Sequence, residues 1–189
     1  MGRPIQFILG GAARFIGGAP CIPTAEGKIA VASAAREDAT EPIRAVRQLP
    51  ESPERVFRAW TDPDEFARWW RPGPYTTTSV EMAVRVGGNY RVVMQAPDGR
   101  IQELFGTYVE VQPPSRLVFT FALRGSPKDD GYTAIVSIDF RPHLNGTELI
   151  LVHERIPAAS RPLFATGWDV VLGRLLDHFT PQNRSGCGV

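Results

Sequence analysis

The sequence predicts a single domain of the α+β class, in which an antiparallel sheet packs against one long C-terminal helix. Three observations support this prediction. Turn-forming residue pairs separate alternating segments through the middle of the chain. Two short segments before them each begin with a cap residue and a proline. Near the C-terminus, apolar residues recur at helical spacing. The 189 residues, 43% hydrophobic and 22% charged, suffice for one such domain.

We expect the folded domain to span residues 42–180. Residues 1–41 are rich in Gly and Ala and show no sustained apolar period, which predicts a flexible N-terminal extension. Residues 181–189 predict a loose C-terminal tail. The chain has two cysteines, Cys21 and Cys187, one in each of these end segments, so no disulfide scaffold is expected and a reducing compartment fits best.

The domain begins with a strand and two short helices. Alternation from Ile43 to Leu49 predicts the strand, which ends at a proline. Ser52 precedes the next proline, the order of an N-cap and a first-turn proline, and predicts the first helix. Asp62 likewise precedes a proline and is the expected N-cap of the next helix. Glu65, three residues later, could accept a hydrogen bond from the backbone N–H of Asp62, as in a capping box. A second short helix is therefore expected directly after the first.

From Tyr75 onward the apolar period changes to two residues. Asp98-Gly99 and Asn145-Gly146 lie between alternating segments and predict tight hairpin turns that need positive φ. Together with the first strand, the segments predict an antiparallel sheet of about six to seven strands. The expected strands include Tyr90–Gln95, Ile101–Val111, Arg116–Leu123, Ala134–Arg141 and Thr147–Glu154.

The last element is a helix of about 17 residues between Pro162 and Pro181. Such a helix is about 25 Å long, enough to cross a curved sheet. Its apolar residues fall on one stripe, which predicts that this face packs on the sheet. The stripe consists of Phe164, Trp168, Val171, Leu172, Leu175, Leu176 and Phe179.

Charge and motifs exclude several classes of function. A balance of 21 basic and 20 acidic residues gives a net charge of +1, which argues against a nucleic-acid binder. No apolar stretch is long enough to span a membrane. The sequence holds no phosphate loop, no Gly-x-Ser-x-Gly and no His-Glu-x-x-His. Since His143, His153 and His178 lack metal-ligand spacing, we expect neither a metal site nor a cofactor.

Two polar residues are candidates for a site. His153 shares a strand face with Thr147, Leu149 and Leu151, which fits either a hydrogen-bonded structural histidine or a ligand contact. Glu103 precedes an apolar segment and, if buried, could orient a polar group of a ligand.

Large aromatic side chains come from both the helices and the strands. All four tryptophans, Trp60, Trp69, Trp70 and Trp168, lie on expected helices or their ends. Two interpretations stay open. The aromatic side chains form a plain hydrophobic core, or a bent sheet and one covering helix leave an apolar cavity for a small molecule.

An ordered series of motifs runs through the body of the chain. It comprises Ser52-Pro53-Glu54-Arg55-Val56-Phe57, Trp60-Thr61-Asp62-Pro63, Trp69-Trp70, Gly87-Gly88, Met94, Asp98-Gly99, Gly106-Thr107-Tyr108, Pro113-Pro114-Ser115-Arg116-Leu117-Val118-Phe119-Thr120, Gly146-Thr147-Glu148-Leu149, His153 and Gly167-Trp168. With this series, about residues 43–180 resemble the bacterial proteins related to the C-terminal domain of the activator of heat-shock-protein-90 ATPase.

The resemblance implies the helix-grip fold of the START-like (SRPBCC, Bet v 1-like) superfamily, which also includes polyketide cyclases and lipid-transfer domains. In that fold a sheet wraps a long C-terminal helix around a hydrophobic cavity. By this analogy the expected ligand-binding residues are Trp69, Met94, Tyr108, Phe119, Phe121, Trp168 and Leu172, with Glu103 and His153 as polar candidates.

The leading hypothesis is a soluble cytoplasmic protein, a monomer or homodimer, that binds a small hydrophobic or aromatic ligand rather than catalysing a reaction. One alternative is a cyclase- or hydrolase-like enzyme in which Glu103 or His153 handles a proton. Another is a chaperone-associated module that binds a partner through an exposed face.

Overall fold

The computed structural model describes residues 41–125 and 133–180 as seven strands and three helices. Residues 1–40 of the expected extension, the expected tail 181–189 and both cysteines lie outside these ranges. The elements, in chain order, are β1 (Ile43–Leu49), α1 (Pro53–Thr61), α2 (Pro63–Trp69), β2 (Thr76–Met82), β3 (Asn89–Gln95), β4 (Ile101–Gln112), β5 (Arg116–Arg124), β6 (Ala134–His143), β7 (Gly146–Glu154) and α3 (Arg161–Phe179).

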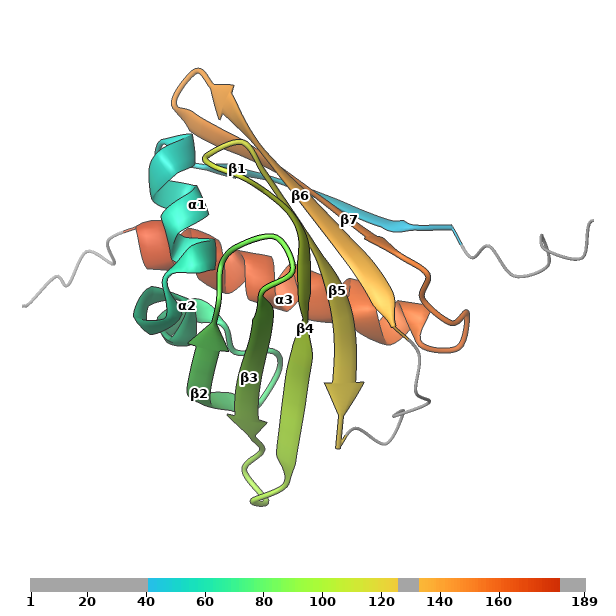
Figure 1. The fold of residues 1–189 in the computed structure, drawn as a ribbon. Coiled ribbons are helices and arrows are strands. Elements are labelled where there is room, and N and C mark those ends of the chain that lie inside the picture. The colour runs from blue at the N-terminus through green and yellow to red at the C-terminus, as the bar shows by residue number, and fades with distance from the viewer. Residues whose placement is uncertain (1–40, 126–132, 181–189) are drawn as a thin grey trace, which may run out of the picture. The chain divides into compact units, whose positions relative to one another are not determined.

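The seven strands form one antiparallel sheet in the order β1-β7-β6-β5-β4-β3-β2. Strands β2 to β7 follow one another as a meander, and β1 pairs with β7 at the edge. The register shifts between Tyr108 and Glu110, an irregularity of the kind that bends a sheet. Figure 1 shows α3 running across the sheet. The predicted α+β architecture is confirmed, including the long helix held by a curved sheet.

The two short helices begin at the predicted residues. The side chain of Ser52 accepts a hydrogen bond from the backbone N–H of Arg55 (3.3 Å), and Asp62 accepts one from that of Glu65 (2.9 Å). The reciprocal half of the expected capping box is wrong. The carboxylate of Glu65 is bound instead by Arg55 and by Nε2 of His178 (3.0 Å), because these partners lie beside it where α1, α2 and α3 meet.

The hairpin between β6 and β7 differs from the prediction by one residue. The turn consists of Leu144 and Asn145, because His143 and Gly146 already pair across the strands. Gly146 starts β7 where a Cβ atom would lie 2.0 Å from the carbonyl oxygen of Leu49. The close backbone approach and the positive φ of 146° both favour glycine there. Gly99, in the other predicted turn, has the expected positive φ of 85°.

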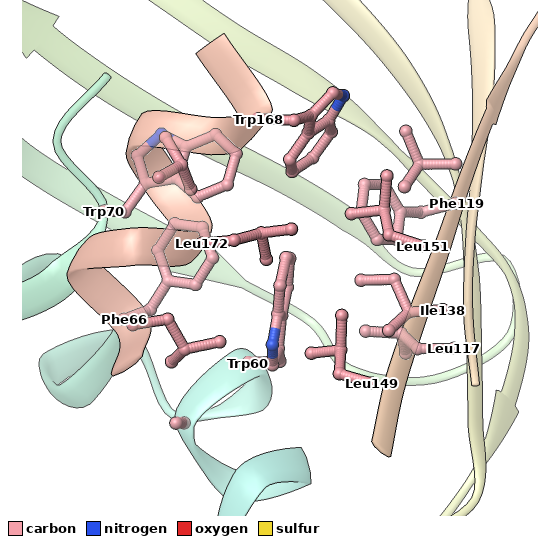
Figure 2. Close-up of a cluster of buried hydrophobic side chains, with 14 of the residues drawn as sticks. Trp60, Phe66, Trp70, Leu117, Phe119, Ile138, Leu149, Leu151, Trp168 and Leu172 are labelled. Atoms are coloured by element: carbon pink, nitrogen blue, oxygen red, sulfur yellow. The ribbon is translucent and has the colours of Figure 1, made fainter. Parts of the chain in front are cut away.

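The hydrophobic core lies between the sheet and the helices. Figure 2 shows Trp60 and Phe66 from the two short helices and Trp168 and Leu172 from α3 facing Leu149 and Leu151 of β7. Five residues of the predicted stripe on α3 are buried, and Phe164 and Leu176 are partly buried. The described part of the chain contains no helix long and apolar enough to cross a membrane.

Candidate functional site

A cavity of about 410 Å³ lies between α3, the strands β3 to β5 and the loop after α2. Three of the predicted ligand-binding residues line it, namely Met94, Phe121 and Trp168. The other lining residues are Trp70, Pro72, Gly73, Pro74, Tyr75, Gln102, Leu104, Leu123, Leu163, Phe164, Thr166, Gly167, Val170 and Val171. The interior therefore contains an apolar cavity beside a tightly packed hydrophobic core.

Strand alternation and helical spacing position the cavity walls. Met94 and Gln102 face each other in the β3–β4 register, and Leu104 follows two residues later on the same face of β4. Phe121 and Leu123 occupy the equivalent face of β5. The opposite wall comes from α3, one flank of which faces the loop after α2.

The loop after α2 is held against α3 by a hydrogen bond that Arg174 donates to the carbonyl oxygen of Gly73 (3.0 Å). At the rim, Leu163 and Val170 of α3 are 53% and 36% exposed. These apolar side chains are seven residues apart, two helical turns, so they lie on the same side of the helix. The cavity therefore opens to solvent past an apolar rim.

None of the lining residues in the described part of the chain carries a formal charge. Its polar side chains are the amide of Gln102, the hydroxyl of Thr166 and the phenol of Tyr75. The hydroxyl of Thr166 donates a hydrogen bond to the carbonyl oxygen of Pro162 (3.1 Å). Such a surface suits an apolar ligand with few polar groups.

His153 lies behind the cavity wall rather than on it. The indole N–H of Trp168 donates a hydrogen bond to Nδ1 of His153 (2.9 Å). The imidazole also contacts the rings of Phe121 and Phe164, at centroid distances of 4.9 and 5.2 Å. Because these three aromatic residues line the cavity, His153 supports its wall from the second layer.

The environment of His153 keeps its imidazole neutral. Burial lowers its pKa from 6.5 to about 3. Because Nδ1 accepts the hydrogen bond of Trp168, the neutral ring carries its proton on Nε2. Nε2 is buried and has no hydrogen-bond partner within residues 41–125 and 133–180. The predicted shared face with Thr147, Leu149 and Leu151 is confirmed, and all four residues are fully buried.

Glu103 points to the other side of the sheet. Its carboxylate accepts hydrogen bonds from Arg91 (2.5 Å) and Arg124 (3.4 Å), and it lines a shallow depression on that outer face. The hydrogen bond from Arg91 lowers the pKa of Glu103, which favours the ionised form. Alternation explains the placement, because Gln102 and Leu104 on either side are the inward-facing residues of β4.

The remaining predicted residues are buried elsewhere in the core. Trp69 donates its indole N–H to the carbonyl oxygen of Ala59 (2.9 Å) and contacts the ring of Trp60. Leu172, on the core face of α3, is fully buried. Tyr108 and Phe119 line a separate void of about 20 Å³. These four side chains build the packing that surrounds the cavity, and none of them lines it.

Several lining residues were missed in the sequence. Gln102 interrupts an otherwise apolar inward face of β4, and this interruption is visible in the sequence once the strand is placed. Leu163 and Val170 lie beside the predicted apolar stripe of α3, so the helical spacing did not single them out as lining residues. The loop 72–75 has no period, so only tertiary contacts bring it to the cavity. In the described ranges, no group of three or more His, Cys, Asp or Glu side chains could hold a metal ion.

Comparison with known proteins identifies the family. The family model for "Activator of Hsp90 ATPase homolog 1-like protein" matches residues 51–180. A crystal structure of a protein from Chromobacterium violaceum is similar, with 32% identity, a TM-score of 0.65 and coverage of 75% of this chain and 98% of that chain. The solution structure of an AHSA1-like protein from Aeromonas hydrophila has 26% identity, a TM-score of 0.56 and coverage of 71% and 91%.

A protein from Nitrosomonas europaea shares the fold at 21% identity, with a TM-score of 0.64 and coverage of 73% of this chain and 93% of that chain. No curated protein matches. The ordered motifs, the sheet that holds a long C-terminal helix and the family match agree, and the chain belongs to the Activator of Hsp90 ATPase homolog 1-like family.

Proposed function

We propose that this domain binds one small hydrophobic or aromatic molecule in the cavity between the sheet and α3. The observation that carries the proposal is the cavity itself, whose volume of about 410 Å³ is typical of small-molecule sites. Its walls are largely aromatic and aliphatic, so a bound apolar molecule would lose contact with water on most of its surface.

The open rim supports the same proposal. Leu163 and Val170 are exposed beside the cavity, whereas the comparable side chains on the core face of α3 are buried. A ligand that extends to the rim would cover this apolar surface as well. Catalysis by Glu103 or His153 gains no support, because neither side chain lines the cavity.

A cavity-filling substitution tests the proposal. Gly167 lines the cavity, and a Cβ atom added there meets no atom within 4 Å, so Gly167→Leu places a side chain beside the cavity without a clash at its base. Gly173 on the same helix is equally open but does not line the cavity, which makes Gly173→Leu the matched control.

The measurement is the fluorescence titration of each protein with Nile red, an uncharged aromatic dye that brightens in apolar surroundings. We expect the original protein and Gly173→Leu to bind the dye equally, and Gly167→Leu to bind it about tenfold more weakly, or about 1.4 kcal/mol. No binding to the original protein, or equal binding to both variants, would contradict the proposal.

The chaperone-associated role stays a prediction from the resemblance. A pull-down with a bacterial heat-shock-protein-90 homologue, beside a control without bait, would test that role separately from ligand binding.

A further inference from the structure

The cavity wall contains one side-chain amide that makes no hydrogen bond within the described ranges, that of Gln102. Gln102 is 8% exposed and lines the cavity between the apolar residues Met94 and Leu104. Its side chain makes no hydrogen bond to any residue in the described ranges, although an amide offers two donors and an acceptor. The other inward positions of β3 and β4 are apolar, aromatic or glycine, namely Tyr90, Val92, Met94, Leu104, Gly106 and Tyr108.

The Gln102 amide lines the cavity and binds no residue in the described ranges, so it is free to bind a ligand. Buried polar side chains in folded proteins are hydrogen-bonded in the large majority of cases, because a lost hydrogen bond to water is otherwise uncompensated. Met94 opposite and Leu104 beside Gln102 cannot supply one. A group inside the cavity is therefore the natural partner of this amide.

The walls also restrict the charge and shape of the ligand. Among residues 41–125 and 133–180, no charged side chain lines the cavity, so an ionised group placed inside would lose hydration without a compensating charge from these residues. The aromatic lining side chains are Trp70, Tyr75, Phe121, Phe164 and Trp168, which offer ring faces and edges for contact with a flat ring system. Tyr75 adds a hydroxyl that makes no hydrogen bond to residues in the described ranges.

We infer that the ligand is an uncharged aromatic molecule with a carbonyl oxygen that accepts a hydrogen bond from the side-chain amide of Gln102. This inference rests on the proposed function and adds the chemical class of the ligand. The carbonyl fits because it is a strong acceptor without a charge, and both Gln102 and Tyr75 carry donors. The aromatic body of the ligand fills the apolar remainder of the cavity.

Four naphthalene derivatives with the same ring and different substituents test the inference. 2-Acetylnaphthalene carries the carbonyl, and 2-ethylnaphthalene has a similar shape without an acceptor. 2-Naphthoate and 2-naphthyltrimethylammonium carry a negative and a positive charge. Each dissociation constant is measured by displacement of Nile red or, if the dye does not bind, by titration calorimetry.

Gln102→Met keeps the length of the side chain and removes its hydrogen-bonding groups. We expect it to weaken binding of the ketone by about fivefold to tenfold, the usual net effect of one hydrogen bond, and to leave binding of the ethyl compound unchanged. Binding of the ethyl compound also shows that the variant is folded. Gln112→Met, at the exposed end of the same strand, is the control and should change neither affinity.

The outcomes separate the inference from the proposed function. Binding of ketone and ethyl compound that changes equally in Gln102→Met, or stronger binding of either charged probe than of the ketone, would overturn the inference and leave cavity binding intact. If none of the four probes binds the original protein although Nile red does, only the inference fails. If Nile red does not bind either, the proposed function fails together with the inference.

Discussion

The buried imidazole of His153 predicts that the protein loses stability as the pH falls below about 6.5. The folded protein holds this ring neutral because burial disfavours its charged form. A protonated Nδ1 could also no longer accept the hydrogen bond of Trp168. The unfolded chain exposes the ring to water and lets it take up a proton freely. In this pH range the unfolded state therefore binds more protons, so stability rises with pH and is lost on acidification.

The size of the effect follows from the two pKa values of His153. Its pKa is 6.5 when exposed and about 3 in the folded protein. The contribution of His153 is fully present above the first value and falls by about 1.4 kcal/mol for each pH unit between the two. Lowering the pH from about 7.5 to about 5 should therefore reduce the free energy of unfolding by about 2 kcal/mol through His153 alone.

Urea unfolding followed by tryptophan fluorescence measures this loss. His153→Gln keeps a hydrogen-bond acceptor near Trp168 but does not titrate, so its loss between the two pH values should be about 2 kcal/mol smaller than that of the original protein. His143→Gln, at the exposed end of β6, is the control and should keep the pH dependence that His153 confers. The same pH dependence in the original protein and in His153→Gln would refute the reasoning.

Three substitutions test the local structure by the same unfolding measurement. Asp62→Ala removes the acceptor for the backbone N–H of Glu65 and should lower the free energy of unfolding by about 1 kcal/mol. An unchanged free energy of unfolding would mean that this cap does not stabilise the protein. Gly106→Ala places a Cβ atom 2.0 Å from the carbonyl oxygen of Thr120 on the neighbouring strand. It should cost about 3 kcal/mol, and a variant of unchanged stability would contradict the close approach of β4 and β5. Gly173→Ala meets open space in the middle of α3 and should gain about 1 kcal/mol from helix propensity, whereas a loss would show a contact that the structure lacks.

Most elements of the fold could be predicted because their signals are local. Ser52 and Asp62 each precede a proline and cap a helix through a hydrogen bond to an amide three residues away. The alternation that places His153 among buried leucines needs no more than its own strand. A prediction from local sequence is wrong where a residue distant in the chain offers a competing partner. The carboxylate of Glu65 binds Arg55 and His178 instead of the backbone N–H of its cap residue.

The candidate site was harder to predict than the fold, because lining a cavity depends on the depth of a side chain as well as on its face. Tyr108, Phe119 and Leu172 face inward as expected but lie where the packing is tight. Met94 and Phe121 face inward where the packing leaves space. The periodicity of the sequence shows that these residues face inward, but it does not show which of them border a cavity.

The sequence by itself determined the class of the domain, the order of its elements and the face on which His153 lies. These properties follow from side-chain period, caps and turn residues, which act over a few positions of the chain. Only the tertiary structure decided where the interior stays open, because a cavity depends on how β3 to β5, α3 and the loop after α2 meet. That meeting placed Gln102 at the cavity and Glu103 on the outer face, two neighbours in sequence separated by the sheet.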